Sequence, residues 1–126
     1  MKKSVLVIDD DADDLLFFEL ALWQINPSCE CITSTDPTEA LQKLKLELLK
    51  PNFIFLDLNM PGMSGQECLR EIKKIAHLGD TPVIILTTSI SRKDIEEVLL
   101  LGAYCCLHKP NTIQELVKSI KKFIDV

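Results

Sequence analysis

The chain has 126 residues, of which 47% are hydrophobic and 26% are charged, and its net charge is −5 at neutral pH. This size and composition are those of one globular domain, large enough to bury a core without disulfide or metal crosslinks. No apolar run approaches the roughly 20 residues of a membrane span, and no signal-peptide core is present. We therefore expect a cytoplasmic protein without a membrane partner. The acidic balance, with no stripe of lysine or arginine, argues against nucleic acid as the main partner.

Short strand-like runs alternate with longer helical patterns along the whole chain. The runs rich in apolar or β-branched residues span Ser4–Asp9, Cys29–Ser34, Phe53–Asp57, Thr81–Thr88 and Tyr104–His108. The helical patterns span Leu15–Ile25, Asp36–Leu49, Ser64–Ala76, Ser91–Leu101 and Asn111–Ile124. Asp36, Ser64 and Thr112 are each followed three residues later by glutamate, which is typical of a capped helix start. Gly102 stands where the fourth helix should stop.

This order predicts the fold class. Apolar strands such as Val83–Leu86 indicate burial on both faces of a parallel sheet with helices on either side. Right-handed crossovers then give an α/β, doubly wound, five-stranded parallel sheet flanked by five helices. We find no linker or repeat, so residues 1–126 are expected to form one domain.

The cysteines do not follow a metal-binding or disulfide pattern. They occur as a CxC pair, a single residue and an adjacent pair: Cys29 and Cys31, Cys68, and Cys105 with Cys106. No CxxC spacing is present, and an odd number suits a disulfide framework badly. We expect reduced and mostly buried thiols, with a redox role for the adjacent pair as the alternative.

Polar residues stand at the carboxyl ends of four of the predicted strands. They are Asp9, Asp10 and Asp11 at the first strand, Asp57 and Asn59 at the third, Thr87 and Thr88 at the fourth, and His108, Lys109 and Pro110 at the fifth. In an open parallel sheet, ligands bind beyond the carboxyl ends of the strands. Clustered carboxylates repel one another unless a cation lies among them. Oxygen ligands without histidine or cysteine suit Mg²⁺, so the sequence predicts a magnesium site at this edge.

A carboxylate can act as a nucleophile and form an aspartyl phosphate. Asp57 is the best candidate at this edge, because it faces the other acids and has no acidic neighbour in the sequence. Phosphoryl transfer needs positive charge around the equatorial oxygens, which Mg²⁺ and Lys109 can supply, and Thr87 can add a hydrogen bond. Taken singly, each residue has a structural interpretation, since an aspartate after a strand is commonly a turn or cap residue. Their combination at four strand ends favours a phosphoryl-transfer site.

The chain resembles the response-regulator receiver domains of two-component signalling, which have a flavodoxin-like fold. The matching stretches are VLVIDDD, FIFLDLNMPGMSG, VIILTTS and GAYCCLHKP, in that order along the chain. The resemblance implies that Asp57 accepts a phosphoryl group from a histidine kinase. It also implies that Asp10, Asp57 and the backbone carbonyl of Asn59 bind Mg²⁺ directly and that Asp9 binds it through water.

The resemblance further implies that Thr87 and Lys109 contact the phosphoryl group and that the Lys109–Pro110 peptide bond is cis. The sequence departs from the family three residues before the lysine. Receivers usually carry tyrosine or phenylalanine there, whereas this chain has Cys106, and its nearest aromatic residue is Tyr104.

The implied function is a signalling switch and not an enzyme. No output domain follows the fifth helix, so we expect a stand-alone regulator, monomeric or weakly dimeric, that binds another protein when phosphorylated. The alternative is a relay intermediate that passes phosphate to a histidine phosphotransfer protein. A flavin-binding protein would need a phosphate loop after the first strand, where DDDADD would repel phosphate. A Mg²⁺-dependent aspartyl phosphatase would need a second acid where this chain has Asn59.

The first helix carries more apolar residues than one buried face needs. Helical spacing predicts an inward face of Asp14, Phe17, Phe18, Ala21, Leu22 and Ile25, and an outward face of Leu15, Leu16, Glu19, Leu20 and Trp23. A contiguous exposed apolar patch centred on a tryptophan is typical of a protein interface. We therefore expect Leu16, Leu20 and Trp23 to form a docking surface for a histidine-bearing partner, unless neighbouring segments cover them.

Overall fold

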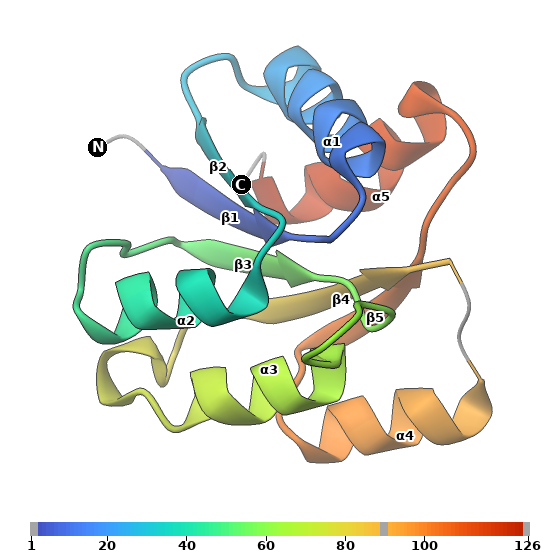
Figure 1. The fold of residues 1–126 in the computed structure, drawn as a ribbon. Helices are drawn as coiled ribbons and strands as arrows, with labels where there is room; N and C mark the ends of the chain where they lie inside the picture. The colour runs from blue at the N-terminus through green and yellow to red at the C-terminus, as the bar shows by residue number, and fades with distance from the viewer. Residues whose placement is uncertain (1–2, 89–90, 125–126) are drawn as a thin grey trace.

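A computed structural model describes residues 3–88 and 91–124 of the chain as an α/β domain, with a five-stranded parallel sheet between two layers of helices (Figure 1). The strand order is β2-β1-β3-β4-β5. The strands are β1 (Ser4–Ile8), β2 (Glu30–Ser34), β3 (Phe53–Leu56), β4 (Val83–Thr87) and β5 (Cys105–His108). The helices are α1 (Ala12–Ile25), α2 (Pro37–Lys45), α3 (Gly65–Lys73), α4 (Arg92–Leu100) and α5 (Ile113–Ile124), with a 3₁₀ turn at Ala76–Leu78. The predicted fold class is confirmed.

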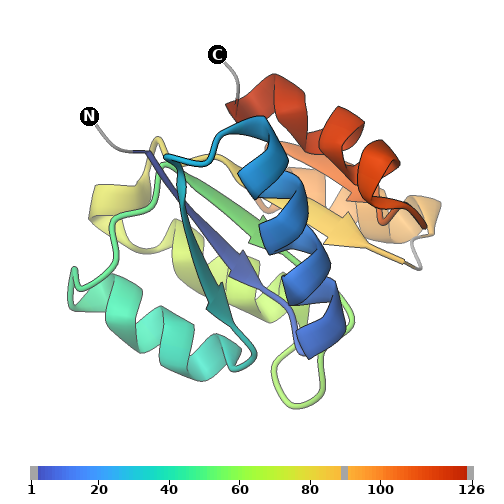
Figure 2. The same cartoon turned by 90° about the horizontal axis from the view of Figure 1, so that it is seen from above.

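The two faces of the sheet have separate apolar cores. Helices α1 and α5 cover one face, and α2, α3 and α4 cover the other (Figures 1 and 2). Phe55 on β3 points to the α1/α5 side, where its ring lies 4.8 Å from that of Phe18 and 6.1 Å from that of Phe123. Its neighbours Ile54 and Leu56 point to the opposite core. Because successive strand residues face opposite sides, both faces must be apolar, as the sequence shows.

Helix α1 begins three residues earlier than its apolar pattern predicts. The Asp11 side chain caps it, accepting hydrogen bonds from the backbone N–H groups of Asp13 and Asp14. The predicted faces are correct in most positions and wrong in two. Leu15, expected to face outward, is buried, whereas Phe17, expected to face inward, is half exposed. The helix is therefore rotated slightly towards Leu15 relative to the predicted stripe.

Helix α2 ends at Lys45 and not at the predicted Leu49. The chain turns at Glu47, whose φ of 58° lies in the left-handed region and is incompatible with a continuing helix. Pro51 also disfavours helical backbone at the residue before it. As a result Leu46 and Leu48 are exposed instead of extending the buried face. Among the described residues, no helix has the length and hydropathy that a membrane span requires.

Candidate functional site

Parallel register brings the predicted site residues to one edge of the sheet. Ile8 of β1 is paired with Leu56 of β3, so the next residues, Asp9 and Asp57, are neighbours. Thr87 of β4 is paired with His108 of β5, and the N–H of Lys109 donates to the Thr87 carbonyl at 2.8 Å. The strand ends thus gather residues from four separate parts of the sequence.

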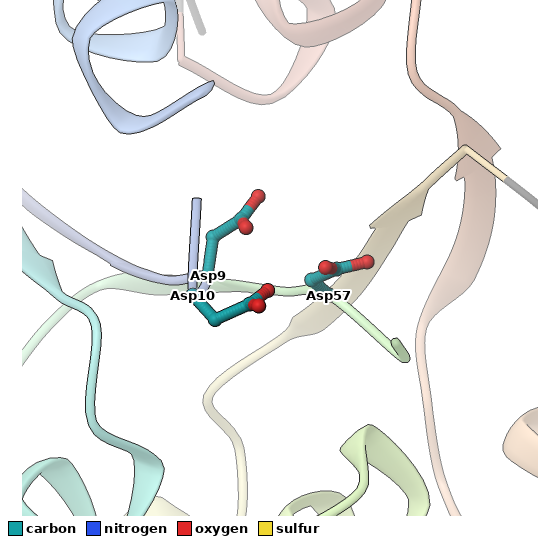
Figure 3. Close-up of side chains that lie close together, drawn as sticks. All are labelled: Asp9, Asp10 and Asp57. Carbon is teal, nitrogen blue, oxygen red and sulfur yellow. The ribbon is translucent and has the colours of Figure 1, made fainter. Parts of the chain in front are cut away.

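Three carboxylates form a cluster at this edge. Asp9, Asp10 and Asp57 each place a carboxylate oxygen within 4.8 Å of the others, and their side chains lie together at the ends of β1 and β3 (Figure 3). Asp9 and Asp57 are buried and Asp10 is exposed. Three carboxylates, those of Asp9, Asp14 and Asp57, lie within 4 Å of the ammonium group of Lys109, and Asp10 adds a fourth acid to the cluster. This excess of negative charge and the all-oxygen donor set fit a hard divalent cation.

Lys109 reaches into the carboxylate cluster from the end of β5. Its Nζ lies 2.6 Å from Asp9 Oδ2, 2.8 Å from Asp14 Oδ2 and 3.6 Å from Asp57 Oδ2. The expectation of a cis bond at Lys109–Pro110 is wrong, because the described residues contain no cis peptide bond. The Lys109 side chain reaches its partners with the more common trans peptide.

Burial and pairing shift two pKa values at the site. Burial raises the pKa of Asp9, and this effect exceeds the lowering by its hydrogen bonds with Lys109 and the N–H of Asp11. Burial by itself would lower the pKa of Lys109, but the hydrogen bonds to Asp14 and Asp9 outweigh it and raise the pKa. Lys109 is therefore a permanent cation, and the negative charge of the buried Asp9 carboxylate needs compensation.

Asn59 links Thr87 to Asp57. The Thr87 side chain is fully buried, and its Oγ1 accepts a hydrogen bond from Asn59 Nδ2 at 3.2 Å. The N–H of Asn59 points to Asp57 Oδ1 at 3.4 Å. The Asp57 carboxylate thus has the Asn59 backbone N–H on Oδ1 and the Lys109 ammonium 3.6 Å from Oδ2.

Comparison with known proteins identifies the family. The model of the response regulator receiver domain matches residues 5–121. The chain belongs to the response regulator receiver family. Response regulator Rcp1 of Synechocystis sp. is 31% identical over 94% of this chain and 84% of its own length. Two-component response regulator ARR15 of Arabidopsis thaliana is 34% identical over 95% of this chain, which spans only 61% of ARR15.

Solved structures of related proteins show the same fold. The phosphorylated cyanobacterial phytochrome response regulator RcpA superposes with a TM-score of 0.88 at 30% identity, over 98% of this chain and 91% of RcpA. The Mn²⁺-bound form of Rcp1 gives a TM-score of 0.78 at 28% identity, over 96% of this chain and 91% of Rcp1. The chain is therefore a receiver domain of a two-component, phosphorelay-type regulator, a class whose members bind Mg²⁺ or Mn²⁺ in an acidic pocket.

The segment after Asp57 is fixed by glycine. Gly62 has a φ of +83°, a conformation that glycine adopts without strain. Gly65, the first residue of α3, packs so closely that an added Cβ would lie 2.4 Å from the Asp57 carbonyl oxygen and 2.5 Å from Leu58 Cα. The Gly65 N–H donates to the Leu58 carbonyl at 3.0 Å. The start of α3 is thereby held against the backbone that carries Asp57, a contact that no sequence pattern predicted.

Cys106 occupies the position where receivers usually carry tyrosine or phenylalanine. Cys106 is half-buried and packs against the core under α2, α3 and α4. Tyr104 is 65% exposed and packs edge-on against Phe123 of α5, with 6.0 Å between ring centroids. Burial raises the pKa of Cys106 to about 11 and also raises that of Cys105, so both thiols are protonated at neutral pH. This protonation disfavours a redox role for the pair.

Of the five cysteines only Cys68 is fully buried, so the expectation of mostly buried thiols is wrong.

Proposed function

We propose that the protein is a phosphorylation-dependent switch in which Asp57 accepts a phosphoryl group from a histidine kinase. The observation that carries this proposal is the placement of Lys109, Thr87 and two further carboxylates around a buried aspartate at the sheet edge. Residues 1–126 would act as one receiver domain in the cytoplasm, as a monomer or weak homodimer. Phosphorylation would change which protein it binds.

In the proposed step, a carboxylate oxygen of Asp57 attacks phosphorus, and a P–O bond forms as the P–N bond to the donor histidine breaks. The histidine nitrogen keeps the bonding electron pair, and no proton needs to leave Asp57. The Lys109 ammonium, 3.6 Å from Asp57 Oδ2, stabilises negative charge on the phosphoryl oxygens. The Thr87 hydroxyl, already held by Asn59, can donate to one of these oxygens.

Asp9, Asp10 and Asp57, with Asn59, are the residues that would hold Mg²⁺. Bound there, the cation supplies positive charge to the phosphoryl oxygens. The Mn²⁺-bound structure of Rcp1 supports a divalent cation in a related protein. In this chain the support comes from the carboxylate oxygens gathered within 4.8 Å of one another.

Mg²⁺ should stabilise the protein, and the effect should depend on pH. At an ion concentration of about ten times its Kd, Mg²⁺ adds about 1.4 kcal/mol to the free energy of unfolding, which thermal melts with and without Mg²⁺ will measure.

The pKa of Asp9 is raised in the folded state, so Asp9 contributes to stability at pH values below its ordinary pKa of 3.8. That contribution is lost as pH rises through the folded pKa. Ionised Asp9 is thus a cost at neutral pH that Mg²⁺ offsets, and the Mg²⁺ increment should shrink as the solution is acidified towards that pKa.

The Asp10→Asn variant provides the matched comparison for this experiment. Removing one of three clustered carboxylates should raise the melting temperature of the Mg²⁺-free protein and reduce the increment caused by Mg²⁺. A wild-type melting curve that does not move in millimolar Mg²⁺ would show that the cluster is no metal site.

The switch and the phosphatase alternatives are separated by stoichiometry. Incubation with acetyl phosphate and Mg²⁺ should add one phosphoryl group per chain, whereas a phosphatase would turn over an added phosphomonoester. Asn59 stands where the phosphatase mechanism needs an acid, which favours the switch. A relay intermediate would carry the same Asp57 phosphate but lose it to a histidine phosphotransfer protein, which a mixing experiment with that protein detects.

The exposed face of α1 is the proposed docking surface for the histidine-bearing partner. Leu16, Leu20 and Trp23 are 56%, 44% and 66% exposed, so no described segment covers them, and Phe17 extends the patch towards the site. We expect the double variant Leu20→Ser, Trp23→Ser to slow phosphotransfer from a histidine kinase by roughly thirtyfold, the effect of losing one hot spot. Labelling by acetyl phosphate, which needs no docking, should stay unchanged.

The control is the double variant Leu46→Ser, Leu48→Ser, which removes another exposed apolar pair, just after the end of α2. It should be phosphorylated by the kinase at the wild-type rate. If the α1 variant loses labelling from both donors equally, the patch supports the fold and the docking assignment is wrong.

A further inference from the structure

Lys109 is held by the first turn of α1 as well as by the strand ends. Asp14 Oδ2 accepts a hydrogen bond from Lys109 Nζ at 2.8 Å, across 95 positions of sequence. Asp9 accepts at 2.6 Å, while Asp57 Oδ2 lies at 3.6 Å, beyond hydrogen-bond distance. An ammonium group has three N–H donors. Two of those of Lys109 are therefore committed to acceptors other than Asp57.

The two partners of Lys109 differ in how easily they can be given up. The Asp9 side chain is 6% exposed, so separating it from the lysine would leave a buried charge without its partner. The Asp14 side chain is 33% exposed, so water can replace the lysine there. Asp14 also stands outside the cluster of Asp9, Asp10 and Asp57. Of the two contacts, the one with Asp14 is the exchangeable one.

We propose that Asp14 is a positioning residue that competes with the phosphoryl group on Asp57 for Lys109. This inference rests on the proposed function, because it assumes that the phosphoryl group forms on Asp57. In the unphosphorylated protein, Asp14 draws the ammonium towards α1. In the phosphorylated protein, a phosphoryl oxygen takes over the donor that Asp14 loses. The strength of the Asp14 contact then sets how tightly the site holds the phosphoryl group.

Water can take the place of the lysine at Asp14. A cavity of about 220 Å³ opens between α1 and the start of α5, and its wall includes Asp9, Asp14, Phe17 and Lys109. Asp57 does not line this cavity, so Asp14 borders open space on the side away from the phosphorylation site. When the lysine turns towards Asp57, the carboxylate of Asp14 can therefore be hydrated without a change in the packed core.

The test is the affinity for beryllofluoride, a phosphoryl analogue, measured by calorimetry in saturating Mg²⁺. Asp14→Asn replaces the carboxylate by a neutral group of the same shape, so beryllofluoride should bind about three- to tenfold more tightly than to wild type. Asp13→Asn is the matched control, because Asp13 is an exposed residue in the same first turn of α1 and is not one of the ion-pair partners of Lys109. It removes the same charge and should change the affinity by less than about twofold. Asp14→Glu, which keeps the carboxylate, should restore affinity towards the wild-type value.

The outcomes separate the inference from the function on which it rests. Tighter binding in Asp14→Asn alone supports competition for Lys109. If Asp14→Asn and Asp13→Asn change the affinity for beryllofluoride equally, the cause is the lost net charge, and the inference is overturned. Weaker binding in Asp14→Asn would make Asp14 an aid to the lysine and overturn it as well. If wild-type protein binds no beryllofluoride, the proposed function fails first, and the role of Asp14 falls with it.

Discussion

Asp57→Asn should abolish phosphorylation by acetyl phosphate and Mg²⁺. An amide oxygen is a far weaker nucleophile than a carboxylate, so the P–O bond no longer forms. Asparagine has nearly the shape of aspartate, and Asp57 is buried at the end of β3, so the fold should be retained. Removing one of the clustered carboxylates also lessens the repulsion among them, and the Mg²⁺-free variant should melt no lower than wild type.

Intact-mass spectrometry measures this effect directly. Wild-type protein should gain one phosphoryl group that hydroxylamine removes, as expected for an acyl phosphate, and the variant should gain none. Asp13→Asn, an exposed aspartate in the first turn of α1, should be labelled like wild type. Full labelling of Asp57→Asn would move the acceptor elsewhere, and Asp10, the exposed acid of the cluster, would then be the first residue to test.

The location of the site could be predicted from the sequence because the carboxyl ends of parallel strands all lie at the same edge of the sheet. Asp9, Asp57, Thr87 and Lys109 each follow a recognisable apolar strand, so their convergence required only the sheet topology. The contact between Lys109 and Asp14 was not predicted, although Asp14 was assigned to the inward face of its helix. Acids in a first helical turn also complement the helix dipole, so the position of Asp14 has a sufficient local explanation without any contact to Lys109.

The end of α2 and the buried face of α1 were predicted incorrectly, because the sequence pattern of each helix does not contain the constraint that decides it. The apolar periodicity of α2 continues through Leu46 and Leu48, but the chain must reverse towards β3, and it turns at Glu47. In α1 the pattern is apolar on nearly every side, so periodicity could not fix the rotation of the helix. Packing against β1 and α5 fixes it, which buries Leu15 and exposes Phe17.

Gly65→Ala should destabilise the protein more than any other glycine-to-alanine change at a position with ordinary backbone angles. The added Cβ would meet the Asp57 carbonyl oxygen at 2.4 Å and Leu58 Cα at 2.5 Å, and both are backbone atoms that cannot rotate away. Overpacking of this kind costs about 1–3 kcal/mol, which corresponds to roughly 4–12 °C in melting temperature for a domain of this size. Thermal unfolding followed by circular dichroism measures the shift.

Gly79→Ala is the matched control for this prediction. Its added Cβ would lie 3.5 Å from the nearest atom, an ordinary van der Waals contact, so its melting temperature should stay close to wild type. Gly65→Ala should also slow labelling by acetyl phosphate, because relieving the clash moves the backbone of Asp57 and Leu58 and disturbs the hydrogen bond from the Gly65 N–H to the Leu58 carbonyl. If Gly65→Ala has the same melting temperature as Gly79→Ala and is labelled at the wild-type rate, α3 does not hold Asp57 in place. The position of the acceptor must then depend on the strand ends and on the carboxylate cluster itself.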